Sequence, residues 1–234
     1  MASFRFAMMK SLFAIIEEYK RAELFKAHKE WGIVEPANTN LMAYGKYPQS
    51  DEWLRNDGLQ AIVSSDYDVY FFPIDHNKCY EDDVGADALK CDGFIFRDDK
   101  SVIVFVELKN RLVGSEDLDS IAKACIEANS SSTVSEQDKD LWLSKAALQL
   151  RDTILRFNRS DPDVCQMFPA RHYAYISNRK AGYDIDFMAE STKEEFRNQT
   201  GFELRINTRI RISAIPPPIK LQLLTSGELA EMTA

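Results

Sequence analysis

The clearest hydrophobic pattern in the chain is VIVFVEL, residues 102–108, where every position except Glu107 is apolar. A short, continuous apolar run predicts a central β-strand covered on both faces, here over residues 101–109. A second strand is predicted at 87–96, and the polar turn RDDK at 97–100 joins the two. The pattern therefore predicts a hairpin in the middle of the chain.

The part of the chain before this hairpin predicts one helix, one long connection and one strand. Apolar residues near helical spacing predict an amphipathic helix over 8–30. Residues 31–58 hold two prolines, three glycines and several short polar residues, which predicts a long connection. A strand is expected at 60–63 or at 67–74, followed by the acidic loop 75–86.

The part after the hairpin predicts helices and strands in turn. A short helix is expected at 116–128 and a stronger one at 136–158, followed by a strand at 172–177. Residues 203–212, ELRINTRIRI, alternate apolar and polar positions, which predicts a half-buried antiparallel strand. Residues 219–234 read as a tail or a weak helix.

Composition adds the class of protein. A chain of 234 residues with 45% hydrophobic content suits one soluble domain, taken here as 1–218 with 31–58 and 110–135 as connections or insertions. The net charge of −8 argues against coating nucleic acid through global charge, although a local basic cleft remains possible. The four cysteines form no CxxC pair, and no stretch approaches the roughly 20 apolar residues of a membrane span. We therefore expect a cytoplasmic protein.

Candidate catalytic residues fall where the two hairpin strands meet. Glu107 and Lys109 are two positions apart, so they project from the same face of their strand, and the hairpin brings Asp92 beside them. Two carboxylates and an ammonium at one place are the groups that a Mg²⁺-dependent phosphodiesterase needs. A charged pair at the end of a buried strand conflicts with the burial pattern, and such conflicts concentrate at functional sites.

Asp92, fourteen intervening residues and then Glu107-Leu108-Lys109 form a motif that resembles the PD-(D/E)xK nuclease superfamily. The predicted order of elements over residues 8–178 is similar to the topology of that family. The resemblance implies an α/β fold with a restriction-endonuclease-like core, in which helices flank a central mixed sheet. The implied order is α-β-β-β-α-β, and an extra C-terminal strand follows.

The chain departs from the family pattern at two positions. Cys91 replaces the family's leading proline, which does no chemistry, and Thr153 stands where a QxxxY subgroup has its tyrosine, so that subgroup is not assigned. The family often carries a glutamine or lysine on the helix after the third strand. Lys145 and Gln149 lie one turn apart there, and the resemblance implies a role for them at the site.

The resemblance also implies roles around a metal. Asp92, Glu107 and the carbonyl of Leu108 would hold one or two Mg²⁺ ions, for which Mn²⁺ can substitute. Lys109 would orient the attacking water or stabilise the developing phosphate charge. Family members sometimes add an acidic residue from the first helix. The candidates for it, among which the sequence does not choose, are Glu17, Glu18 and Glu23.

The implied substrate is DNA, cut internally by an endonuclease that serves restriction or phage defence as a homodimer or with a partner protein. Residues proposed to contact its phosphates are Lys145, Arg179, Lys180, Arg205, Arg209 and Arg211. A solvated strand face and an ordinary polar turn are the alternatives for these basic residues.

The motif residues also fit roles without catalysis. Asp92-Gly93 is a common turn dipeptide, and Glu107 with Lys109 would make an ordinary ion pair at a strand end. A non-catalytic interaction or sensor module of a defence or toxin system would share the fold. A structural or assembly protein unrelated to nucleic acid is the third alternative.

Overall fold

The computed structural model describes residues 14–16, 24–36, 41–48, 59–77, 80, 88–109, 142–159, 163–178 and 190–213. The strands are β1 Phe25–Val34, β2 Tyr44–Lys46, β3 Ala61–Pro73, β4 Gly93–Phe96, β5 Ile103–Lys109, β6 His172–Asn178, β7 Glu203–Ile206 and β8 Arg209–Ile212. The helices are α6 Trp142–Asn158, α7 Val164–Met167 and α8 Glu190–Thr200. Within the described residues, no helix is long and apolar enough to cross a membrane.

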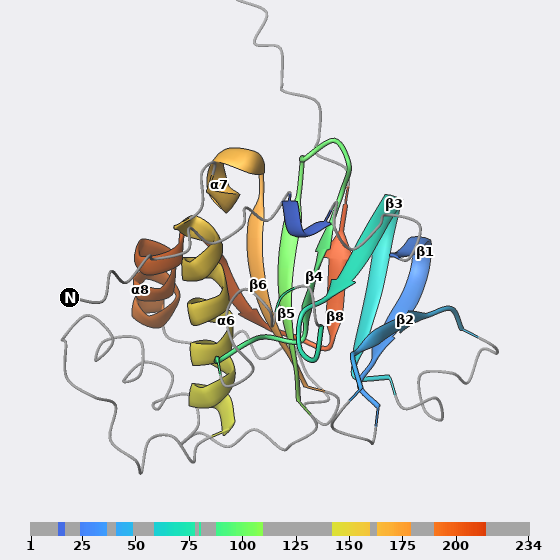
Figure 1. Ribbon diagram of the computed structural model, residues 1–234, viewed down its shortest axis with the longest axis horizontal. Helices are drawn as coiled ribbons and strands as arrows, with labels where there is room; N and C mark the ends of the chain where they lie inside the picture. Colours follow the sequence, from blue (N-terminus) through green and yellow to red (C-terminus); the bar gives the residue numbers. More distant parts are fainter. Residues whose placement is uncertain are drawn as a thin grey trace, which may run out of the picture.

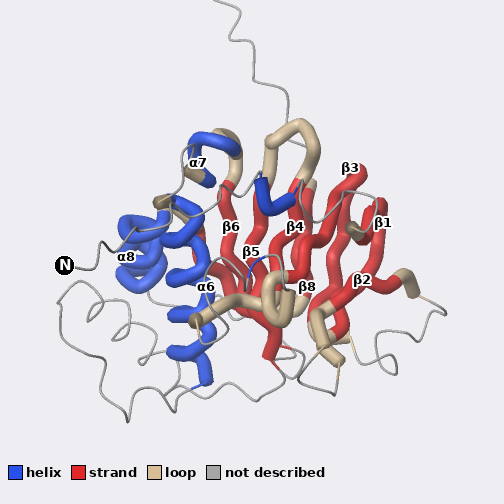
Figure 2. The backbone as a smooth tube through the Cα atoms, in the orientation of Figure 1, coloured by secondary structure: helices blue, strands red, loops and turns tan. Residues whose placement is uncertain are grey.

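The strands form one mixed sheet in the order β2-β1-β3-β4-β5-β6-β7, with β8 paired to β3. Strands β3, β4 and β5 are antiparallel neighbours, whereas β5, β6 and β7 run parallel. Helices α6 and α8 lie together on one side, and β1 to β3 lie on the other (Figures 1 and 2). An α/β fold with a mixed sheet flanked by helices is therefore confirmed.

Strand β5 is buried on both faces, as its apolar run predicts. Ile103 and Phe105 join the cluster that contains Phe157 of α6, while Val104 and Val106 join a second cluster on the opposite face. The aromatic rings of Phe105 and Phe157 lie 5.9 Å apart. Burial on two sides makes β5 a central strand of the fold, and only Lys109 at its end is partly exposed.

The opposite face of β5 is covered by a bend in the sheet itself. Strand β1 pairs with β3 from Ala61 to Phe71, whereas β8 pairs only with the first half of β3 and β4 only with its second half. Trp31, Val63 and Ile210 from that first half and its partners pack in the same cluster as Val104. The Ser177 hydroxyl at the end of β6 donates to the carbonyl of Gln60, just before β3, at 2.7 Å. Strands β4 and β5 lie between β3 and β6 in the sheet, so this contact requires the sheet to curve.

The predicted hairpin is confirmed, with the turn at Asp98 and Asp99 and strands that begin later than expected. Strand β6 and helix α6 are also confirmed, although 136–141 lie outside the described residues. The two alternatives for a strand at 60–63 or 67–74 are parts of one bent strand, β3. The predicted helix at 116–128, the insertion 110–135 and the tail 219–234 lie outside the described residues.

The predicted helix over 8–30 is wrong from Phe25 onward, where β1 begins, and the connection 31–58 contains the end of β1 and all of β2. Lys29 has a φ of 63°, and the pairing of β1 with β3 shifts between Ala27 and Lys29. This irregularity breaks the two-residue alternation of a strand. The buried residues Ala27 and Trp31 therefore fall at a spacing that resembles a helix.

The predicted antiparallel strand at 203–212 is two strands, each parallel to its partner. The alternation itself is correct, because Leu204, Ile206, Ile210 and Ile212 are all buried. The strand breaks where the Asn207 side chain accepts a hydrogen bond from the Arg209 amide at 2.7 Å. Helix α8 was not predicted, because Phe196 is its one strongly apolar residue.

Candidate active site

The two motif strands bring Asp92, Glu107 and Lys109 to one place. Asp92 immediately precedes β4, and its Oδ2 accepts a hydrogen bond from the Leu108 amide at 2.6 Å. Lys109 Nζ donates to Glu107 Oε1 at 2.5 Å, near the end of β5. The Asp92 carboxyl group is also within hydrogen-bonding reach of Glu107 when one of the two carries a proton. The three side chains therefore form one connected cluster.

The cluster is buried on the helix-covered side of β5. Asp92 is 8% exposed and Glu107 is 1% exposed. Burial raises the pKa of Glu107 to about 7, although the neighbouring Lys109 ammonium favours its charged form. Burial and then the charge of Glu107 hold the pKa of Asp92 well above its usual range. Both carboxyl groups therefore resist ionisation unless positive charge is added.

The second oxygen of Glu107 is the feature that points to a cation. Oε2 is buried and has no hydrogen-bond partner among the described residues. When Asp92 and Glu107 are both ionised, neither can donate to the other, and Oε2 then needs a donor from water or a cation. Among the described residues no group of three or more His, Cys, Asp or Glu side chains could hold a metal ion. A metal would therefore depend on this pair, the Leu108 carbonyl and water.

Helix α6 fixes the segment that leads into Asp92. Gln149 Nε2 donates to the Lys90 carbonyl at 2.7 Å, and the Cys91 amide donates to Thr153 Oγ1 at 2.9 Å. Gln149 was predicted to act in catalysis. Its side-chain nitrogen instead binds the backbone carbonyl of Lys90. The sequence did not suggest the hydrogen bond between Thr153 and the Cys91 amide. Proline, the family's residue at position 91, has no N–H and could not donate this bond.

We expect the Thr153 hydroxyl to matter more for stability than its methyl group. Thr153→Val keeps the shape but leaves the buried Cys91 N–H without its acceptor, which costs about 1–3 kcal/mol. Thr153→Ser keeps the hydroxyl and serves as the matched control. Urea unfolding of both variants measures the difference. A Val variant as stable as the Ser variant would show that this hydrogen bond contributes nothing.

Two further carboxylates, Glu35 and Asp75, act on the cluster electrostatically. The charge of Glu35 contributes to the raised pKa of Asp92 and of Lys109, and Asp75 contributes to that of Glu107. Gln60 Nε2 donates to Glu35 Oε2 at 3.0 Å, which fixes that side chain just after β1. Glu35 was not among the predicted site residues, because residues 31–58 were assigned to a connection. Recognising β1 as a strand would have placed Glu35 at a strand end.

The proposed DNA-contacting arginines do not share one strand. Arg205 on β7 donates to Glu203 Oε1 at 2.9 Å and stacks over Tyr173, with its guanidinium carbon 4.5 Å from the ring centre. Arg209 and Arg211 are exposed on β8, which pairs with β3. The three arginines therefore come from two strands, because the chain breaks at Asn207, and their proposed contacts with DNA stay predictions.

One of the remaining predicted site residues lies on the surface, and the others lie outside the described residues. Lys145 is exposed on α6, one turn before Gln149. The candidates that lie outside the described residues are Glu17, Glu18, Glu23, Arg179 and Lys180. Their proposed roles stay predictions.

Comparison with known proteins gave no relative for this chain. No family model matches it, and no match was found among curated proteins or solved structures.

Proposed function

We propose that the protein is a Mg²⁺-dependent endonuclease that hydrolyses phosphodiester bonds in DNA. The observation that carries the proposal is the buried pair of Asp92 and Glu107, with Lys109 bonded to Glu107 and one carboxylate oxygen left without a donor among the described residues. A bound cation would neutralise the negative charge of this buried pair, and carboxylate and carbonyl oxygens are ligands that suit Mg²⁺ or Mn²⁺. The place of the enzyme in restriction or phage defence, as a homodimer or with a partner chain, is part of this proposal.

The connectivity supports a restriction-endonuclease-like core. Strands β3, β4 and β5 follow one another as antiparallel neighbours, α6 covers the face that carries Glu107, and β6 returns parallel to β5. This is the β-β-β-α-β part of the topology expected for the PD-(D/E)xK superfamily. The motif residues lie at the start of β4 and the end of β5, where the expected fold has its site.

Each residue has a role that its surroundings support. Asp92 and Glu107, with the carbonyl of Leu108, would hold the cation. When bound, Mg²⁺ supplies polarisation of the scissile phosphate and a lower pKa for the attacking water. Lys109 keeps its charge, because burial lowers the pKa of its ammonium less than Glu107, Asp92 and Glu35 together raise it. That ammonium would orient the water or stabilise charge on the phosphate.

The direct test is incubation of supercoiled plasmid with the protein and Mg²⁺ or Mn²⁺. We expect nicked or linear product with either ion and none with EDTA, because both carboxylates need the cation to act together. Agarose electrophoresis over time measures the rate. Equal product with EDTA, or none with either ion, would contradict the proposal.

A non-catalytic interaction or sensor module is the second candidate, and the burial of Glu107 favours it. Each carboxylate has an internal partner, so the cluster can also serve as a structural link between β4 and β5. In that case metal would change neither the melting temperature nor the plasmid. A thermal-shift measurement with Mg²⁺ therefore separates the two candidates before any substrate is known.

A further inference from the structure

The end of β1 lies at the same end of the sheet as the end of β5. The Glu35 amide, just after β1, donates to Gln60 Oε1 at 2.8 Å, and Gln60 Nε2 donates to Glu35 Oε2 at 3.0 Å. The Gln60 carbonyl in turn accepts the hydrogen bond from the Ser177 hydroxyl. Ser177 is the register partner of Leu108, the residue before Lys109. A continuous set of contacts therefore connects Glu35 with the strand end that carries Lys109.

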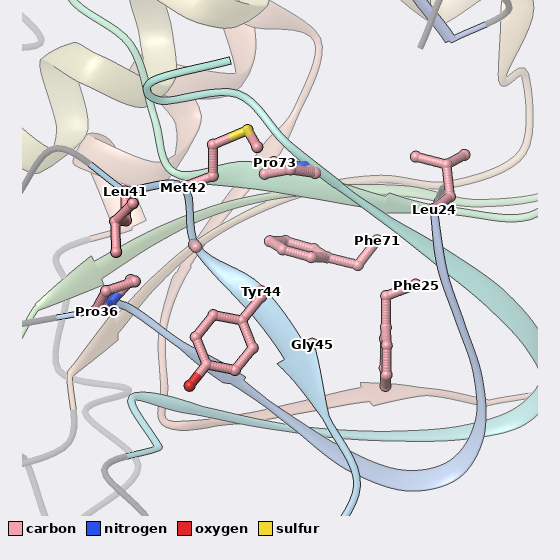
Figure 3. A pocket seen from close by; sticks show the side chains of 10 residues that line it. Leu24, Phe25, Pro36, Leu41, Met42, Tyr44, Gly45, Phe71 and Pro73 are labelled. Atoms are coloured by element: carbon pink, nitrogen blue, oxygen red, sulfur yellow. The ribbon is translucent and has the colours of Figure 1, made fainter. Parts of the chain in front are cut away.

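The pocket beside β2 gives a second indication that these segments meet. Pro36, the residue after Glu35, and Pro73, the register partner of Gly93, both line it (Figure 3). The end of β1 and the end of β3, which pairs with the start of β4, therefore border one pocket.

Three carboxylates act on the ammonium of Lys109, and Glu35 differs from the other two. Burial lowers the pKa of that ammonium, and the charges of Glu107, Asp92 and Glu35 raise it. Asp92 and Glu107 are buried and form the proposed cation site, whereas Glu35 is exposed and stands outside that site. A bound cation would neutralise the two buried carboxylates. Of the three, Glu35 is therefore the carboxylate whose negative charge stays available to Lys109 when a cation is present.

Lys109 and the proposed cation compete for Glu107. Lys109 Nζ donates to Glu107 Oε1 at 2.5 Å, while Oε2 has no hydrogen-bond partner among the described residues. Mg²⁺ binds carboxylate oxygens at about 2.0–2.1 Å, so a cation on Glu107 would lie only a few ångströms from the ammonium. Two positive charges that close repel each other, and more strongly in a buried site than in water. Cation binding therefore weakens the bond between Lys109 and Glu107.

The Lys109 side chain has the freedom to change partner. It is 21% exposed, and its four-carbon stem is flexible. The carboxylate of Glu35 is fixed by contrast, because Gln60 holds the residue through two hydrogen bonds. A carboxylate that is already held in place loses little further freedom when it receives the ammonium.

We infer that Glu35 takes over the ammonium of Lys109 when a divalent cation occupies Asp92 and Glu107, and that it thereby positions Lys109 beside the phosphate. The inference rests on the proposed function, because it requires the cation of that site. Glu35 is a positioning residue in this scheme. It acts on the cation only through Lys109 and is not one of its ligands.

Isothermal titration calorimetry of Mn²⁺ binding tests the inference without any substrate. The proteins compared are the parent, Glu35→Gln, Lys109→Ala and the double variant. We expect Glu35→Gln to weaken Mn²⁺ binding by about 3- to 10-fold, because Lys109 then has no carboxylate to receive it. In the Lys109→Ala background the same substitution should change the affinity by less than about 2-fold. A salt concentration of about 0.3 M screens the longer-range effect of the removed charge.

Glu30→Gln is the matched control. It removes the same charge from another exposed position of the same chain segment, β1, and should bind Mn²⁺ as the parent does. Gln60→Leu is a second variant, which keeps Glu35 but removes both hydrogen bonds that the Gln60 side chain makes with it. It should weaken Mn²⁺ binding in the parent background and not in the Lys109→Ala background. Gln60→Leu carries the test if Glu35→Gln does not fold.

Equal weakening by Glu35→Gln in both backgrounds would make Glu35 a ligand of the cation and would overturn the inference. No weakening in the parent background would overturn it as well. A crystal structure with Mn²⁺ gives the direct view. We expect Lys109 Nζ to donate to Glu35 there, and an ammonium that still donates to Glu107 would contradict the exchange of partners.

The failure of this inference is distinguishable from that of the proposed function. Mn²⁺ binding in which Glu35 and Lys109 are coupled, from a protein that cuts no plasmid, would keep the exchange and remove the endonuclease. Metal-dependent cleavage without that coupling would do the reverse. A parent protein that binds no Mn²⁺ would overturn both.

Discussion

Asp92→Asn, Glu107→Gln and Lys109→Ala should each lower metal-dependent plasmid cleavage by about 100-fold or more. Asp92→Asn and Glu107→Gln remove a charge from the pair that would hold the cation, while leaving the volume of the side chain nearly unchanged. Lys109→Ala removes the ammonium that donates to Glu107. Initial rates of nicking at saturating Mg²⁺ measure the effect.

Asp68→Asn is the matched control for these variants. It also changes one carboxylate to an amide, but Asp68 lies on the surface, where it pairs with Lys26 at 2.7 Å. Exposed ion pairs contribute little, so we expect cleavage and stability close to those of the parent. Cleavage that survives Lys109→Ala unchanged would remove that residue from the mechanism. Equal losses in all four proteins would point to general destabilisation.

The second large effect that we expect is a fall in the stability of the metal-free protein as the pH rises from about 4.5 to about 7. The pKa of Glu107 lies near 7 in the folded protein, against 4.5 for an ordinary glutamate. The folded state therefore keeps a proton that the unfolded chain has lost. The stabilisation is complete below pH 4.5 and is lost as the pH passes 7, which amounts to up to about 3 kcal/mol.

Mg²⁺ should oppose this loss. The cation binds the ionised carboxylates, so the rise in melting temperature on adding Mg²⁺ should be larger at pH 8 than at pH 5. Glu107→Gln removes one of the two buried carboxyl groups and should weaken the pH dependence of the metal-free protein, while Asp92, whose pKa burial also raises, keeps the remainder. Asp68→Asn should retain the full pH dependence. Thermal melts at both pH values test this. If the stability of the parent protein stays constant from pH 5 to pH 8, ionisation of Asp92 and Glu107 does not lower the free energy of unfolding, and the prediction is wrong.

Residues outside the motif were harder to assign from the sequence than the motif itself. Gln149 sits on the expected helix, yet its side-chain nitrogen holds the Lys90 carbonyl. The sequence indicates only that Thr153 stands where a QxxxY subgroup has tyrosine, whereas in the structure its hydroxyl accepts a hydrogen bond from the Cys91 amide. A hydrogen bond between a helix and a segment about sixty residues away leaves no periodic pattern, so a single sequence does not reveal it.

The sequence by itself determined the middle of this protein. The apolar run of β5 and the turn at 97–100 placed Glu107 and Lys109 on one face with Asp92 beside them, since strand geometry is local and repeats every two residues. Only the tertiary structure decided the rest. The irregular pairing at Lys29, the bend of β3 and the break at Asn207 depend on which strands meet. Those long-range contacts placed the arginines on two strands and brought the charge of Glu35 close enough to affect the pKa of Asp92.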